Sequence, residues 1–289
     1  MPKIELNGAR VAYAATGSGE TVLLLHATAS AGAQWQALAE TLRSDWHVVA
    51  PDLYGYGESD PWPGHGPFAL AEEAALAEAV LADAGIANAG RRPFHLIGHS
   101  YGGAVALRLA MQQPERLLSL VLIEPVAFHL LRQEAPSPAN RDLFGEVMEV
   151  AALVSGATAS GDYRHAMARF VDYWNGQGAW LRAKPELQGA LARHTPKVAL
   201  DFWAATTEST PRAAYERIAV PTLILSGARS PRPTRRIAEL LAESLPASRL
   251  QTIDGAGHML PLTHRDAVNA AVLAHLLRNK ADRHRPAAA

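Results

Sequence analysis

Ser100 has the neighbours that a serine nucleophile needs. It lies at the centre of Gly98-His99-Ser100-Tyr101-Gly102, after a short apolar run and before a helical run that stops at Gln113-Pro114. A strand, a sharp turn carrying the serine and a helix form a nucleophile elbow, which holds the hydroxyl clear of its surroundings for a base to reach. The two flanking glycines remove side chains that would collide where the strand and the helix nearly touch. The alternative interpretation is a tight glycine-rich turn with an incidental serine.

A serine nucleophile needs a base, which must come from elsewhere in the chain. His258 stands in Gly255-Ala256-Gly257-His258-Met259, directly after the last expected strand. The glycines around it let the imidazole lean over the edge of a sheet. Other histidines have structural explanations: we expect His99 to be buried within the elbow and His26 to brace a loop. We expect surface or loop positions for His47, His65, His264 and His284.

Alternating strands and helices must position these residues. The continuous apolar run at 21–26 is typical of a strand buried on both faces of a parallel sheet. We expect further strands at 3–6, 10–15, 47–50, 94–97, 118–124, 222–226 and 249–253. We expect helices at 34–43, 68–84, 104–111, 234–245 and 263–277. This order predicts an α/β fold with a mostly parallel sheet covered by helices on both faces.

The alternation is interrupted by 96 residues between Glu124 and Pro221 that carry almost no strand pattern. This stretch holds 10 of the 19 aromatic residues of the chain, so it is not a solvated linker. The aromatic side chains either line a binding pocket or form the core of the stretch itself. We expect helices here at 142–155, 161–174, 185–194, 196–207 and 211–218.

These features resemble the α/β-hydrolase superfamily, over nearly the whole chain from Ile4 to Leu277. The resemblance rests on the elbow, on the glycine-punctuated loop at 52–59, on His26 ending its strand eight residues before Gln34-Trp35, and on Gly257-His258. It implies an α/β-hydrolase fold with residues 1–125 and 219–278 as the core. Residues 126–218 would form an all-helical cap, inserted after the strand that ends at Glu124. We expect the polar tail at 279–289 to be mobile.

The chain departs from the family pattern where the acid of a catalytic triad is expected. Much of the family has aspartate in a Gly-x-x-Asp arrangement after the strand equivalent to 221–226, but this chain has Ser230 there. Some branches take the acid one strand earlier, where this chain has Glu124. A glutamate buried at the end of an apolar strand needs a partner, because an unpaired buried charge is costly. The Nδ1–H of His258 would supply that partner.

The family resemblance therefore implies a triad of Ser100, His258 and Glu124. Asp254 and Asp201 are the alternative acids. In the alternative interpretation without a catalytic role, Glu124 faces solvent or braces the cap.

A second departure is Ala27 after His26, where glycine is common in the family. By analogy, the oxyanion hole would use the backbone N–H groups of Tyr101 and Thr28. Because alanine carries a Cβ, we expect Ala27 to keep a negative φ. We expect the loop at 52–59 to be structural, packed beside the oxyanion loop.

Composition excludes several other classes of function. The net charge is −1 and lysine and arginine form no run, so nothing points to nucleic acid or to an anionic membrane surface. The absence of cysteine excludes disulfides, thiolate metal sites and a cysteine nucleophile. The first residues lack a signal-peptide core, and no apolar stretch approaches the ~20 residues that span a bilayer. We expect a soluble cytoplasmic protein, with the oligomeric state left open.

The interpretation is a serine hydrolase that cleaves a carboxylic ester of a small to medium, apolar substrate through an acyl-enzyme. No metal or organic cofactor is required. The same triad can serve carbon–carbon, lactone or amide hydrolysis, or cofactor-independent lyase or oxygenase chemistry, and the fold alone does not choose among them. A ligand-binding protein with a vestigial triad is the alternative from a different class, and the missing aspartate is its motivation.

Overall fold

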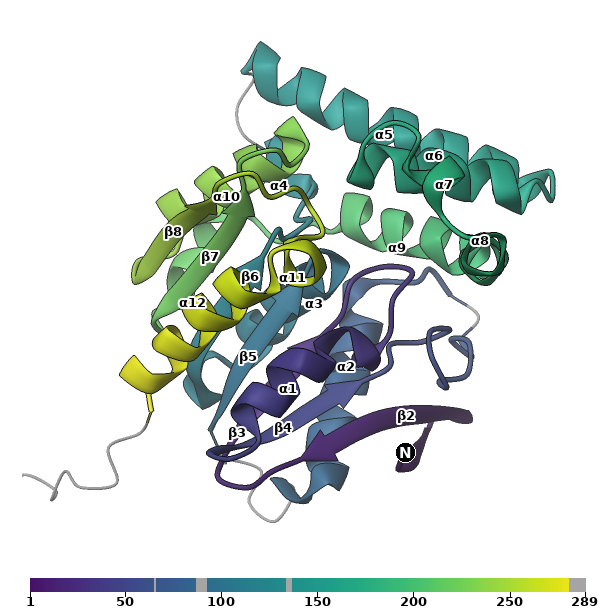
Figure 1. Cartoon of the computed structure of the whole chain (residues 1–289). Coiled ribbons are helices and arrows are strands. Elements are labelled where there is room, and N and C mark those ends of the chain that lie inside the picture. Colours follow the sequence, from purple (N-terminus) through teal and green to yellow (C-terminus); the bar gives the residue numbers. More distant parts are fainter. Residues whose placement is uncertain (65, 87–92, 134–136, 281–289) are drawn as a thin grey trace, which may run out of the picture.

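An eight-stranded sheet forms the centre of the protein (Figure 1). The structure is a computed structural model that describes residues 1–64, 66–86, 93–133 and 137–280. The strand order is β1-β2-β4-β3-β5-β6-β7-β8; β1 and β2 pair antiparallel with each other and β2 pairs antiparallel with β4, whereas all pairs from β4 to β8 are parallel. The strands are β1 Lys3–Leu6, β2 Ala9–Thr16, β3 Glu20–Leu25, β4 Trp46–Pro51, β5 Phe94–His99, β6 Leu117–Ile123, β7 Thr222–Gly227 and β8 Ser248–Ile253.

The parallel strands are buried on both faces, as their continuous apolar runs predict. In β3, Val22 and Leu24 belong to the core on one face, while Leu23 and Leu25 belong to the core on the other. The prediction of a mostly parallel sheet flanked by helices is confirmed. Most strand ends differ from the predicted ones by one or two residues. The difference that concerns Glu124 is in β6, which ends at Ile123, so that Glu124 is the first residue beyond it.

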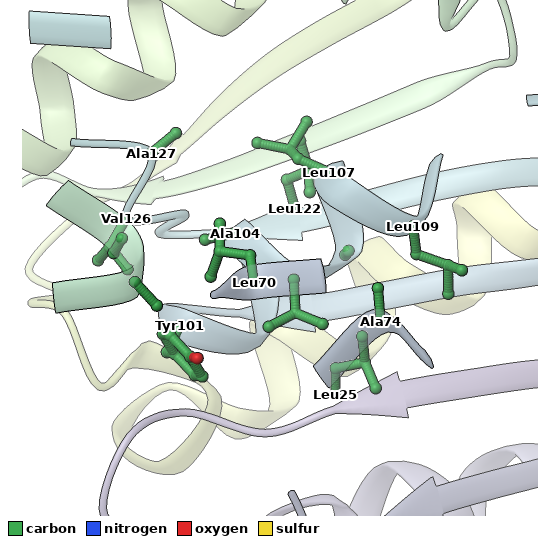
Figure 2. Packing of buried hydrophobic residues seen from close by; sticks show 14 of the residues in the cluster. Leu25, Leu70, Ala74, Tyr101, Ala104, Leu107, Leu109, Leu122, Val126 and Ala127 are labelled. Atoms are coloured by element: carbon green, nitrogen blue, oxygen red, sulfur yellow. The ribbon is translucent and has the colours of Figure 1, made fainter. Parts of the chain in front are cut away.

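Helices cover each face of this sheet. On one face, α1 (Gln36–Leu42) and α12 (Arg265–Arg278) supply Leu38, Leu42, Val268 and Val272 to a core with Trp35 and Trp46. The other face carries α2 (Leu70–Leu81), α3 (Tyr101–Gln112) and α10 (Arg232–Ser244). Figure 2 shows Tyr101, Ala104 and Leu107 of α3 in this second core, which also holds Leu70 and Ala74 of α2 and Leu122 of β6.

The predicted helices of this part lie where expected, with shifted ends. The helix expected at 68–84 is α2, which ends at Leu81 and passes into the short π-helix η2 Ala82–Ile86, where Gly85 has φ 88°. The remaining short elements are η1 Gly32–Trp35, η4 Pro114–Arg116 and α11 Leu260–Thr263.

Between β6 and β7 the described residues form only helices and connecting segments, which we call the helical insertion. Its elements are α4 His129–Gln133, α5 Pro138–Ala159, α6 Tyr163–Asn175, α7 Ala179–Arg182, α8 Pro185–Ala192, α9 Thr195–Thr207 and the 3-10 helix η5 Arg212–Arg217. In Figure 1 the insertion lies beyond the end of the sheet where β5 passes into α3. The α5 helix is four residues longer at each end than predicted, and α4 and α7 are too short for their apolar spacing to have revealed them. The division into separate core and cap domains stays a prediction.

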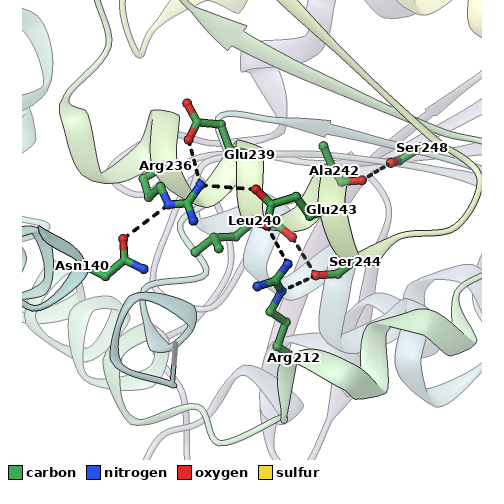
Figure 3. Close-up of polar contacts among 9 residues, drawn as sticks. All are labelled: Asn140, Arg212, Arg236, Glu239, Leu240, Ala242, Glu243, Ser244 and Ser248. Atoms are coloured by element: carbon green, nitrogen blue, oxygen red, sulfur yellow. Dashed lines mark hydrogen bonds and ion pairs between the residues drawn. The ribbon is translucent and has the colours of Figure 1, made fainter. Parts of the chain in front are cut away.

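Polar contacts attach the insertion to α10 (Figure 3). Arg212 of η5 donates to Ser244 Oγ at 2.7 Å and pairs with Glu243 at 2.7 Å. Arg236 of α10 donates to Asn140 Oδ1 of α5 at 3.3 Å. Both ends of the insertion are thereby tied to one helix of the sheet's covering layer.

Some predictions lie wholly or partly outside the described residues, namely those for His65, for His284 and for the tail beyond residue 280. His47 differs from the expectation, because it lies within β4 and is half-buried. Within the described residues, no helix combines the length and the apolar character that crossing a bilayer requires.

Candidate active site

The turn between β5 and α3 holds Ser100 in a backbone conformation that an L-residue rarely adopts. Its φ is 56° and its ψ is −118°. A Cβ at Gly98 would overlap the carbonyl oxygen of Gly102, and a Cβ at Gly102 would overlap that of Leu25. Both positions therefore require glycine, which is the close approach that the motif predicted. The surrounding structure must hold this strained turn.

The structure brings Ser100, His258 and Glu124 together, although they are distant in the sequence. His258 Nε2 lies 2.8 Å from Ser100 Oγ, and His258 Nδ1 lies 3.1 Å from Glu124 Oε2. With Nδ1 protonated, the imidazole donates to the carboxylate and accepts from the serine hydroxyl. All three side chains are buried. The arrangement can pass a proton from the serine to the imidazole.

Glu124 is held as a charged carboxylate by donors on two elements. Its second oxygen, Oε1, accepts from Ser226 Oγ at 3.0 Å and from the Gly227 N–H, both at the end of β7. Burial by itself raises the pKa of the Glu124 carboxyl, but the interactions with His258 and the Gly227 amide outweigh burial and lower that pKa to about 2. The sequence did not reveal these β7 donors.

Neither of the other candidates for the acid, Asp254 and Asp201, pairs with His258, whose carboxylate partner is Glu124. Asp254 is exposed. Asp201 is buried, but its carboxylate contacts Thr28, Tyr56 and Lys197. Ser230, which stands where much of the family has aspartate, is buried close to Gly227.

Thr28 and Tyr101 border the same cavity as Ser100, as an oxyanion hole requires. Tyr101 begins α3, so its N–H is one of the first amides of a helix, which have no acceptor in a preceding turn. Ala27 N–H donates to Gln34 Oε1 at 3.2 Å, which leaves Thr28 as the next amide along the loop. Ala27 avoids positive φ, as expected, whereas Ala29 has φ 56°.

Backbone strain concentrates around Ser100. Among the described residues, the non-glycine residues with positive φ are Asn7, Ala29, Ser100 and Glu124. Asn7 belongs to the turn between β1 and β2, whereas Ser100 and Glu124 belong to the candidate site and Ala29 borders a cavity with Ser100. Strain of this kind persists only where neighbouring structure holds it.

Two buried histidines brace the site. His26 donates through Nδ1 to the Ala27 carbonyl at 2.8 Å and accepts at Nε2 from the Leu53 N–H at 3.0 Å, which joins the oxyanion loop to the loop at 52–59. His99 Nε2 lies 2.9 Å from the carbonyl oxygen of His258. Burial lowers the pKa of each imidazole to about 3, so both stay neutral. The bracing role of His26 was expected; that of His99 was not.

Two cavities meet at Ser100. The inner cavity, lined by buried side chains such as Val126 and Phe202, measures about 20 Å³. The outer cavity, which reaches the exposed Leu187 and Leu262, measures about 370 Å³. Trp174 borders both, and its ring centroid lies 4.1 Å from that of His258. Aromatic residues of the insertion therefore line the site, and they also pack on one another: Phe128, Phe170, Trp174 and Phe202.

Comparison with known proteins gives a family and several relatives. Residues 20–265 match the family described as "alpha/beta hydrolase fold". The pimeloyl-[acyl-carrier protein] methyl ester esterase of Aeromonas hydrophila is 28% identical over 262 residues, which are 86% of this chain and 92% of that protein. A dihydrolipoyllysine-residue acetyltransferase component of an acetoin cleaving system, from Cupriavidus necator, is 38% identical over 125 residues. That match covers 43% of this chain and 32% of the relative, so this chain spans about a third of that protein.

Among solved structures, a hydrolase from Pseudomonas aeruginosa PA01 superposes with a TM-score of 0.71 at 26% sequence identity. The superposition covers 95% of this chain and 97% of the other. The insertion and the sheet are thus both part of an architecture that a whole related chain shares.

Proposed function

This chain belongs to the alpha/beta hydrolase family, and on that premise we propose that it is a serine hydrolase cleaving carboxylic esters of small to medium, apolar substrates. One observation carries the proposal: a serine on a strained turn that opens onto a cavity and lies 2.8 Å from an imidazole that is itself 3.1 Å from a buried carboxylate. In this proposal, residues 1–125 and 219–278 are the catalytic core and residues 126–218 a cap over the site.

Acylation begins when Ser100 Oγ attacks the ester carbonyl carbon while His258 Nε2 takes the hydroxyl proton. The carbonyl oxygen becomes an oxyanion and accepts hydrogen bonds from the N–H groups of Tyr101 and Thr28. The bond to the leaving oxygen then breaks, and His258 gives its proton to the departing alcohol. The acyl group remains as an ester of Ser100.

Deacylation repeats these steps with water. His258 takes a proton from a water molecule, which attacks the acyl carbon, and the same N–H groups hold the second oxyanion. The bond to Ser100 Oγ breaks, the proton returns to that oxygen, and the carboxylic acid leaves. Throughout, Glu124 keeps the imidazole in the correct tautomer and stabilises the imidazolium, which its low pKa allows.

The two cavities support a substrate with unequal groups on either side of the carbonyl. The outer cavity is lined mainly by apolar side chains, including Leu187, Leu191 and Leu262, and takes the larger group. The inner cavity leaves room only for a small one. The Aeromonas relative is named as a methyl ester esterase, a reaction of the same class.

Turnover of two ester series tests this function: p-nitrophenyl esters of increasing acyl length, and methyl esters of increasing acid length, each set against lactones and amides. We expect ester hydrolysis, and a loss of up to about 10⁶ in kcat in Ser100→Ala. Ser209→Ala is the matched control, because Ser209 is exposed and borders neither cavity. If the folded wild-type protein binds esters without cleaving them, the proposed enzymatic function is wrong and a ligand-binding function is favoured. If it cleaves lactones or amides but not esters, the assignment of a carboxylic ester as the cleaved bond is wrong.

A further inference from the structure

A buried cluster of charges lies beside Ser100 and has no part in the mechanism above. Lys197 of α9 pairs with Asp201 one turn later on the same helix and, at 3.0 Å, with Glu73 of α2. These side chains are 8%, 2% and 0% exposed. The ammonium group also lies within about 5 Å of the ring centroids of Tyr56, Phe68 and Tyr101. The cluster joins the helical insertion to the covering layer of the sheet.

Asp201 reaches from this cluster to the oxyanion loop. Its Oδ2 accepts from Thr28 Oγ1 at 2.8 Å and from Tyr56 OH at 2.7 Å, while its Oδ1 faces Lys197. Thr28 and Asp201 are 173 residues apart in the sequence. Asp201 also borders the inner cavity together with Ser100, Thr28 and Tyr101. The carboxylate of the insertion thus contacts the residue whose N–H is assigned to the oxyanion.

The oxyanion loop needs such a restraint. Ala29, directly after Thr28, has φ 56°, a conformation that alanine adopts only when the surroundings enforce it. On the other side of Thr28, a hydrogen bond from Ala27 N–H to Gln34 fixes the loop. The Thr28–Asp201 hydrogen bond is the contact that spans the insertion and this loop at its strained point.

We propose that Asp201 is a positioning residue, which fixes the Thr28 peptide through the threonine hydroxyl, so that the oxyanion hole is complete only when α9 is seated on the core. The inference rests on the proposed function. Lys197, itself paired with Glu73, holds the Asp201 carboxylate in place through Oδ1, the oxygen that does not contact Thr28. The insertion then contributes to transition-state stabilisation as well as to the walls of the cavity.

Substitution of Thr28 tests this proposal directly. Thr28→Val keeps the size and the backbone N–H but removes the hydroxyl. We expect kcat for p-nitrophenyl acetate to fall about 10- to 100-fold, because small misplacements of a catalytic group have effects of that size, while KM changes little. Thr28→Ser, which keeps the hydroxyl, should restore most of the wild-type kcat. The inhibition constant of a trifluoromethyl ketone, which forms an oxyanion on the serine, should rise in Thr28→Val in proportion to the loss of kcat/KM.

Thr222→Val is the matched control, since Thr222 is buried, donates to a backbone carbonyl at 3.0 Å and begins β7 at the end away from Gly227. It should keep the wild-type kcat. A double-mutant cycle adds a second test: in an Asp201→Ala background, which removes the acceptor of the Thr28 hydroxyl, Thr28→Val should cause little further loss of kcat. If Asp201→Ala does not fold, the Thr28 series alone decides.

Several outcomes would overturn the proposal: a wild-type kcat in Thr28→Val, no recovery in Thr28→Ser, or an equal loss in Thr222→Val. These outcomes differ from a failure of the proposed function, in which the folded wild-type protein itself hydrolyses no ester.

Discussion

Two buried carboxylates lie close to Ser100, and they differ in the charged and polar groups that surround them. Glu124, at the end of β6, and Asp201, on α9 of the insertion, are both almost fully inaccessible. Burial raises the pKa of each carboxyl. At Glu124 the imidazole of His258 and a backbone amide reverse that effect and bring the pKa to about 2. At Asp201 the pKa stays raised, although Lys197 and the hydroxyls of Tyr56 and Thr28 act to lower it.

The difference teaches that burial does not decide the state of a carboxyl group; its partners do. Glu124 accepts from His258, Ser226 and the Gly227 amide, whereas Asp201 shares the cation of Lys197 with a second carboxylate, Glu73. The first arrangement suits a group that must support an imidazolium. The second suits a structural joint between two parts of the chain.

The largest expected effect is on the Glu124 side. Glu124→Gln keeps the shape of the side chain but removes the charge that stabilises the imidazolium, so kcat should fall by up to ~10⁴. Steady-state ester hydrolysis measures it. Asp254→Asn, at an exposed carboxylate, is the control and should behave as wild type. Full activity in Glu124→Gln would remove Glu124 from the mechanism and end the contrast between the two carboxylates.

On the Asp201 side, the expected effect is on stability. Lys197→Met leaves two buried carboxylates without their cation, which should reduce the free energy of unfolding by about 3–5 kcal/mol, as measured by urea denaturation. The comparison is Arg43→Gln, because Arg43 and its partner Glu40 are 56% and 67% exposed. Exposed pairs contribute about 0–1 kcal/mol, so this variant should change little. Equal losses of unfolding free energy in the two variants would show that the buried cluster stabilises the fold no more than an exposed ion pair does.

The smallest expected effect is a pH dependence at Glu73. Burial, with Asp201 nearby, raises the pKa of the Glu73 carboxyl from 4.5 to about 7, although Lys197 acts against this. Because the folded pKa lies above the unfolded one, the stabilisation is complete below pH 4.5 and is lost as the pH rises through about 7. Relative to Glu73→Gln, the wild-type protein should therefore lose stability between about pH 5 and pH 8.

Urea unfolding of both proteins across this pH range measures the difference. Glu72→Gln, at the half-buried neighbour on the same helix, should run parallel to wild type. A wild-type protein that runs parallel to Glu73→Gln would mean that Glu73 ionises alike in the folded and unfolded chain.

Local pattern was sufficient for most of the fold. Continuous apolar runs such as that of β3 predicted the buried parallel strands, and the prolines and glycines marked where many helices end. Short helices such as α4 and α7 were missed, because fewer than two turns carry no measurable periodicity. The α5 helix was predicted too short, since both of its ends consist of residues with little apolar pattern.

The candidate site could be predicted only where a residue type stands out from its local context. Ser100 between glycines, His258 in a glycine loop and Glu124 at the end of an apolar strand all do so. The contacts of Asp201 with Thr28 and of His99 with the His258 carbonyl depend on which distant segments meet. Lys197 and Asp201 lie one turn apart on α9, but nothing in the sequence around them identifies Glu73 or Thr28 as their partners.

The central claim is that Ser100 is a nucleophile activated by His258, and covalent labelling tests it most directly. The wild-type protein would be treated with a fluorophosphonate, its intact mass measured and the labelled peptide sequenced by mass spectrometry. The account predicts one adduct per chain, on Ser100, that is absent from Ser100→Ala and forms far more slowly in His258→Gln. A folded wild-type protein that takes up no adduct, or takes one up equally well after Ser100→Ala, would contradict it.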